Sequence, residues 1–151
     1  VLLWKITGTD TYLGLGGGTI AQSFAESQKL WVFLLKILFT CITLCSGFKG
    51  GEIVPSLFIG ATFGSALAPI FGLPVDICAA CGMVGVFCAV TNSPISSLLI
   101  AFELFGFAGM PYFCTVIAVS YLLSGYQSLY KAQKIVYSKT ENKYIDRNTT
   151  S

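Results

Sequence analysis

The fold is decided by the stretch Ser46-Gly47-Phe48-Lys49-Gly50-Gly51-Glu52-Ile53-Val54-Pro55, after which an apolar segment runs from residue 56 to residue 71. The glycines of this turn can adopt backbone angles that direct several amide N–H groups towards one point. Proline has no N–H and a fixed φ, so Pro55 predicts the first or second position of a helix. Unpaired amides at such a helix start can bind an anion, although Gly-Pro clusters more often serve only as helix boundaries.

The composition is that of a membrane protein. The chain is 54% hydrophobic and 11% charged, with a mean hydropathy of +0.76, whereas soluble domains carry roughly 25% charged residues. Between Gly50 and Tyr130 there is no Lys or Arg. The apolar runs are continuous and do not alternate, which predicts helices rather than strands. We therefore expect an all-α, multi-pass membrane protein in a lipid bilayer, and the net charge of +2 is too small to suggest a nucleic acid partner.

Most of the predicted helices are short. Residues 29–45 are the best candidate for a full span, and Lys36 inside them must snorkel, face a wet cavity or find a partner; we expect it to snorkel to the nearer interface. Glycine and proline bound the other helices, which cover residues 19–25, 56–71, 76–90, 95–105 and 112–123. Such helices stop inside the membrane, which is tolerated where broken backbone is buried or lines a cavity. Close-packing faces are predicted at Gly60-x-x-x-Gly64 and Gly82-x-x-Gly85, and an N-cap at Ser93 before Pro94.

The sequence offers no catalytic or metal-binding set. It has no histidine, and its six cysteines, all inside apolar runs, are expected to be small, buried and unpaired. We expect no enzyme activity, no metal and no cofactor. The last residues, 131–151, form a basic tail, which the positive-inside bias places in the cytoplasm. The chain begins without Met in an apolar run, so we expect it to be part of a longer polypeptide.

Several motifs follow one another in a defined order. The first is the turn ending at Pro55, followed by Leu57-Phe58-Ile59-Gly60-Ala61-x-x-Gly64. The others are residues 82–89, Ser93-Pro94-Ile95, Ala101-Phe102-Glu103-Leu104 and Ser128-Leu129-Tyr130. Their order resembles that of the CLC family of chloride channels and proton-coupled anion antiporters, over nearly the whole chain. The first is similar to the family's GxFxP region and the last to the segment with its anion-binding tyrosine.

The resemblance implies a fold and a function. The chain would be the C-terminal half of a CLC membrane domain, a bundle of tilted, short and broken helices that forms half of an inverted-repeat fold. It would transport chloride or a similar small anion, as a voltage-gated channel or an H+/anion antiporter. The homodimer contact would use residues 94–105 and 111–123. The transported anion would be the bound ligand.

The resemblance also implies an anion site. The backbone amides of Glu52 and Ile53 and the hydroxyl of Tyr130 would hold the anion, in a turn shaped by Gly50, Gly51 and Pro55. Ile53 stands where the family usually has Phe, and Glu52 replaces a commonly apolar residue. Glu52 could cap the helix, bond to a polar partner or compete with the anion. For Glu103 we expect a buried acid bonded to neighbouring helix ends rather than a proton relay.

Two other readings stay open at this point. One is a different secondary transporter with broken helices and an anionic substrate, and the other is a membrane subunit that transports nothing. The serine motif and the gating glutamate motif of the CLC family would lie upstream of Val1. The choice between channel and antiporter depends on these two motifs, and so does the preference for chloride or fluoride.

Overall fold

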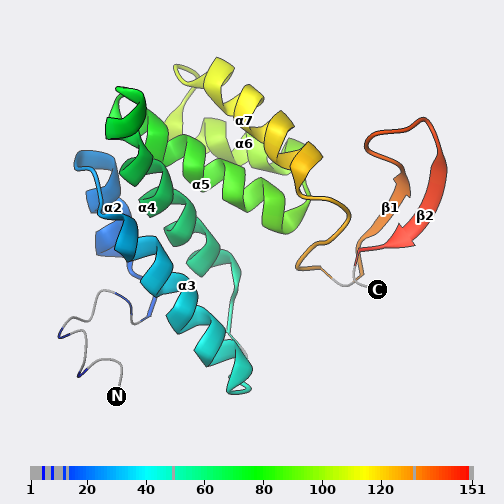
Figure 1. Cartoon of the computed structure of the whole chain (residues 1–151). Coiled ribbons are helices and arrows are strands. Elements are labelled where there is room, and N and C mark those ends of the chain that lie inside the picture. Colours follow the sequence, from blue (N-terminus) through cyan, green and yellow to red (C-terminus); the bar gives the residue numbers. More distant parts are fainter. Residues whose placement is uncertain are drawn as a thin grey trace.

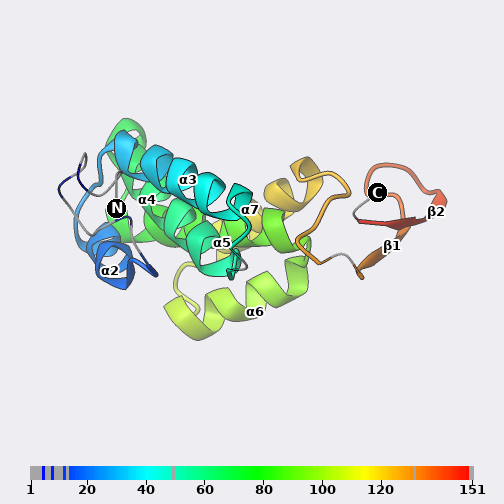
Figure 2. The ribbon, with the colours of Figure 1, turned by 90° about the horizontal axis from the view of Figure 1, so that it is seen from below.

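The described residues form a bundle of six helices, and a two-stranded hairpin lies at the end of the bundle remote from α2 (Figures 1 and 2). The computed structural model describes residues 5, 8, 12, 14–48, 50–130 and 132–149. The helices are α2 (Gly17–Ala25), α3 (Leu30–Cys45), α4 (Ile53–Phe71), α5 (Val75–Thr91), α6 (Pro94–Phe105) and α7 (Met110–Leu123). The strands are β1 (Lys134–Tyr137) and β2 (Tyr144–Asn148). The predicted helical architecture is confirmed.

The helix boundaries follow the glycines and prolines. Helix α4 begins at Ile53, so Pro55 is its third residue rather than its first or second; this is still among the positions whose N–H has no partner within a helix. Helix α4 ends at Gly72 in the left-handed conformation, with φ 63°. Pro94 is the first residue of α6, as predicted, but the Ser93 side chain does not cap it. Its hydroxyl donates instead to the Thr91 carbonyl at 3.2 Å.

The helix that is long enough to cross a membrane is α4 and not α3. Helix α4 has 19 residues and is the helix in the described chain that is long and apolar enough to cross a membrane. Helix α3 has 16 residues, which rise only about 24 Å, less than the roughly 30 Å of a hydrocarbon core. The expectation of a full span at residues 29–45 was therefore wrong. Lys29 lies outside α3 in an extended conformation, which shortens the helix.

Helices α4 and α5 pack backbone against backbone. A Cβ placed on Gly60 would lie 2.5 Å from the Gly82 carbonyl oxygen, and one on Gly64 would overlap the carbonyl oxygen of Cys78. Gly82 in turn faces the backbone of Gly60 and Gly64. The predicted close-packing face is confirmed here, because only a hydrogen fits at these three positions. Gly85 is different, since its face meets the side chain of Val116 on α7.

The rest of the core is built where α5, α6 and α7 meet. Its buried members are small or aliphatic apart from Phe113: Ala80, Val84, Cys88, Ala101, Phe113 and Ile117. All six cysteines are free, as predicted. Only Cys88 is buried, however, and Cys41 and Cys45 are exposed on α3. The expectation that all six would be buried was wrong because α3 contacts α4 along one side only (Figure 1).

Lys36 does not snorkel. Its side chain is 2% exposed, and its ammonium donates to the carbonyls of Tyr12 at 3.2 Å and Gly14 at 2.9 Å. It also lies over the Phe58 ring, 4.8 Å from the centroid. Lys36 thus finds partners inside the protein, because the loop before α2 brings two carbonyls within reach of the middle of α3.

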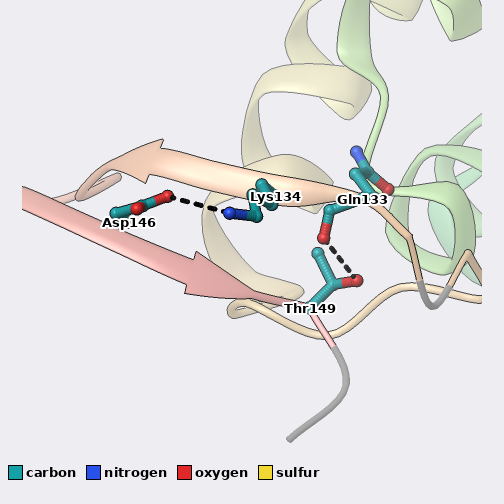
Figure 3. A network of polar contacts seen from close by, with 4 residues as sticks. All are labelled: Gln133, Lys134, Asp146 and Thr149. Carbon is teal, nitrogen blue, oxygen red and sulfur yellow. Dashed lines mark hydrogen bonds and ion pairs between the residues drawn. The ribbon is translucent and has the colours of Figure 1, made fainter.

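The basic tail folds into an antiparallel hairpin that the sequence analysis did not predict. Lys134 pairs with Asn148 and Tyr137 with Tyr144, with an irregular register between Ile135 and Tyr137. The rings of Tyr137 and Tyr144 contact each other edge to face. Lys134 forms an ion pair with Asp146 at 3.8 Å (Figure 3), and because both side chains are exposed it contributes little stability.

A first prediction concerns the contact between α4 and α5. Replacing Gly64 with Ala would drive a methyl group into the Cys78 carbonyl, which only a backbone shift can relieve. We expect the free energy of unfolding to fall by about 1–3 kcal/mol, the usual cost of overpacking. The measurement is denaturant unfolding in detergent. Gly18→Ala on α2, where a Cβ would meet open space, is the control and should be neutral or stabilising; equal stability of both variants would contradict the close contact.

A second prediction concerns Lys36. Lys36→Met keeps the aliphatic stem but removes the charged donor to the carbonyls of Tyr12 and Gly14. A hydrogen bond from a charged group is worth about 1.5–3 kcal/mol, so the melting temperature should fall clearly. Lys29→Met, at an exposed position at the start of α3, is the matched control and should leave it unchanged. Equal melting temperatures of Lys36→Met and Lys29→Met would contradict the two internal hydrogen bonds and would favour a snorkelling Lys36.

Candidate anion site

The first turn of α4 presents unpaired amides. The first bond of this turn joins the Ser56 N–H to the Glu52 carbonyl at 3.2 Å. The N–H groups of Ile53 and Val54 have no partner among the described residues, and Pro55 has none to offer. The positive end of the helix dipole lies at the same place, so an anion is favoured there.

A cavity of about 310 Å³ lies beside this turn. Gly50, Gly51, Glu52 and Pro55 form one wall, and α3 contributes Lys36 to the lining. Gly50 and Gly51 add no side chain, so the backbone itself borders the space. Four of the six predicted site residues therefore meet at one cavity, whereas Ile53 and Tyr130 are not among its lining residues.

Lys36 is a lining residue whose role the sequence analysis missed. Its ammonium has three donors, of which two bond to the carbonyls of Tyr12 and Gly14. The positive charge of Lys36 therefore lies at the border of the cavity to which Glu52 contributes a negative one. A lysine in the middle of an apolar run was the available signal, because such a charge most often marks an ion pathway.

Glu52 does not cap α4. It occupies the N-cap position, but its side chain makes no capping hydrogen bond and is exposed. Its carboxylate has no hydrogen-bond or ion-pair partner among the described residues either. The capping alternative is thus wrong. Glu52 lines the cavity, and its carboxylate is left without a partner among the described residues.

Tyr130 lies in the irregular segment between α7 and β1. Its side chain is 48% exposed, and its hydroxyl has no hydrogen-bond partner within the described part of the chain. Its backbone is well held: Ser128 Oγ accepts from its N–H at 3.2 Å, and Thr149 Oγ1 donates to its carbonyl at 2.9 Å. A second cavity, of about 750 Å³, is lined by the neighbouring Ser128, Leu129 and Thr149.

Glu103 is not the buried acid that was expected. It is exposed near the end of α6 and makes no hydrogen bond to any described residue. Helix α6 buries the face that carries Ser97 and Ala101. Glu103 follows Ala101 by two residues, which turns it to about the opposite side of the helix. The expectation was therefore wrong for this arrangement of helices.

Comparison with known proteins gives consistent results. Residues 1–125 match the model of the family described as voltage gated chloride channel. A chloride/fluoride channel protein of Pseudomonas syringae pv. tomato is 43% identical over 130 residues, which are 86% of this chain and 29% of that protein. The crystal structure of a CLC-type fluoride/proton antiporter superposes with a TM-score of 0.80 at 38% identity. The superposed region covers 85% of this chain and 33% of the antiporter chain.

The chain thus spans about a third of the length of these relatives. The match covers all six helices, and the hairpin lies beyond the part that fits the family model. The family model matches residues 1–125, which are most of the chain. The relative from Pseudomonas is 43% identical over 86% of the chain, which supports the same family. This chain belongs to the CLC family of voltage-gated chloride channels and related anion antiporters.

Proposed function

We propose that the protein containing this chain transports a small anion, chloride or fluoride, across a membrane as a CLC-type channel or proton-coupled antiporter. The observation that carries the proposal is the start of α4, where unpaired amides lie beside a cavity bordered by the charge of Lys36. Such a site attracts an anion through dipoles and a partly engaged cation. Binding of this kind is weak enough for the ion to leave again.

The relatives support the same substrate class. One is named a chloride/fluoride channel and another is a fluoride/proton antiporter. Both names concern small halides. Neither supports the two alternatives left open by the sequence, a different secondary transporter with an anionic substrate and a membrane subunit that transports nothing. The anion ligands of this chain are the amides of Glu52 and Ile53 and, from a separate segment, the hydroxyl of Tyr130.

Family membership makes the protein a multi-pass integral membrane protein. We place the tail, residues 131–151, on the cytoplasmic side because of its lysines and arginine. We also propose a homodimer through α6 and α7. Both helices expose large apolar side chains that a partner would cover: Ile95, Leu99 and Leu104 on α6, and Val119, Leu122 and Leu123 on α7.

The test is halide flux through the full-length protein in liposomes, read with fluoride- and chloride-selective electrodes. We expect flux of at least one halide over that of empty liposomes. In Tyr130→Phe the anion loses a neutral donor. A hydrogen bond to a charged partner is worth about 1.5–3 kcal/mol, so halide affinity by calorimetry should fall by roughly one to two decades.

The matched control is Tyr137→Phe, which removes a hydroxyl from an exposed tyrosine of the hairpin. It should leave both flux and affinity unchanged. No halide flux from the wild-type protein would overturn the proposed function. If Tyr130→Phe shows halide flux and normal halide affinity, Tyr130 is an interfacial anchor and not an anion ligand. The proposal of anion transport then still stands.

A further prediction concerns Glu52, which lines the cavity beside the start of α4. Because like charges repel, its carboxylate opposes the binding of an anion there. Glu52→Gln should raise halide affinity by about tenfold, since solvent screens part of the repulsion at this exposed position.

Affinity and melting temperature are measured on the same preparation, with Glu26→Gln, an exposed acid after α2, as the control. A lower melting temperature in Glu52→Gln with unchanged halide affinity would mean that Glu52 only stabilises the turn.

A further inference from the structure

The segment that carries Tyr130 is irregular, yet its backbone is fixed to the end of α5. The Leu129 N–H donates to the Val90 carbonyl at 3.0 Å, and Ser128 Oγ donates to the Thr91 carbonyl at 3.0 Å. Asn92, buried directly after α5, donates to the carbonyls of Gly125 at 3.2 Å and Gln127 at 3.0 Å. One side of the segment is therefore tied to the helix bundle.

The other side is held by Thr149, directly after β2. Its hydroxyl lies 2.9 Å from the carbonyl oxygen of Tyr130 and 3.1 Å from that of Gln133, and its N–H donates to Gln133 at 3.1 Å. Figure 3 shows the Thr149 side chain directed at the Gln133 carbonyl. Thr149 is 2% exposed, so water does not replace these bonds easily. The Gln133 amide completes the link by donating to the Asn92 carbonyl at 3.2 Å.

The hairpin that delivers Thr149 is itself attached to the bundle. Lys139, in its turn, donates to the Tyr121 carbonyl at 2.7 Å and to Ser124 Oγ at 3.0 Å, at the end of α7. The ammonium also lies over the Tyr121 ring, 3.9 Å from the centroid. The hydroxyls of Tyr126 and Ser138 add a bond of 2.8 Å. The hairpin therefore spans from α7 to the Tyr130 segment.

From these contacts we propose that the hairpin, residues 134–149, is a clasp that positions Tyr130 for the anion, with Thr149 as the positioning residue. The N–H and the carbonyl of Tyr130 are both engaged, by Ser128 and Thr149, whereas its hydroxyl stays free. The backbone is thus fixed and the donor left for a ligand. The inference rests on the proposed anion-binding role of Tyr130. It assigns a function to residues beyond the part that matches the family model.

The experiment measures halide affinity by calorimetry in the full-length protein. Thr149→Val keeps the shape of the side chain and removes the hydroxyl, so affinity should fall about three- to tenfold. Thr149→Ser restores the hydroxyl and should restore the affinity. Thr115→Val, at an exposed position on α7 where the hydroxyl donates to the Pro111 carbonyl of the same helix, is the control and should change nothing.

A double mutant separates positioning from general support of the fold. If Thr149 acts through Tyr130, Thr149→Val should cause no further loss of affinity in a Tyr130→Phe background. A full additional loss there, or normal affinity in Thr149→Val alone, would overturn the proposal. Normal affinity in Tyr130→Phe would instead show that the proposed role of Tyr130 had failed.

Should Thr149→Val fail to fold, Lys139→Met detaches the hairpin from α7 without touching residues 128–133. A clasp predicts weaker halide binding in this variant too, and unchanged binding would overturn it.

Discussion

The close contact between α4 and α5 is the constraint on which the rest of the structure depends. In lipid, apolar side chains gain little by leaving the solvent, so helices associate through packing and hydrogen bonds. Gly60, Gly64 and Gly82 let the two backbones meet. Half of the α4 span is buried as a result. A helix held along its length in this way has a fixed start, and so do the amides of Ile53 and Val54.

The cavity at that start combines three kinds of charge. The helix dipole and Lys36 favour an anion, whereas the carboxylate of Glu52 opposes it. Lys36 already bonds to two carbonyls, so its charge acts mainly as a fixed field and only its third proton is left for a ligand. This balance fits the proposed anion transport, because a fully free ammonium would hold the anion more firmly.

The sequence predicted the helices well and the contacts of single charges poorly. Helices α4 to α7 were found within a few residues because glycine and proline end them by local sterics, which need no knowledge of the fold. Lys36 and Glu103 were placed wrongly because their burial depends on which helix faces which. The partners of Lys36 are backbone carbonyls, which carry no signal in the side-chain sequence.

The hairpin was missed for a related reason. The run Lys134–Tyr137 is short, and the irregular register between Ile135 and Tyr137 breaks the alternation that marks a strand. The positive charge of the tail suggested only a side of the membrane. Of the residues predicted to hold an anion, Gly50, Gly51, Glu52 and Pro55 line one cavity, whereas no periodic pattern could indicate what holds Tyr130.

The two segments that carry the proposed anion ligands are held by different means. The amides of α4 belong to a helix packed through its glycines, which cannot move without separating α4 from α5. Tyr130 belongs to an irregular segment held by hydrogen bonds to Val90, Thr91 and Thr149. The start of α4 is thus held by backbone packing and the Tyr130 segment by hydrogen bonds, so a single substitution at Gly64 disturbs the first and one at Thr149 the second.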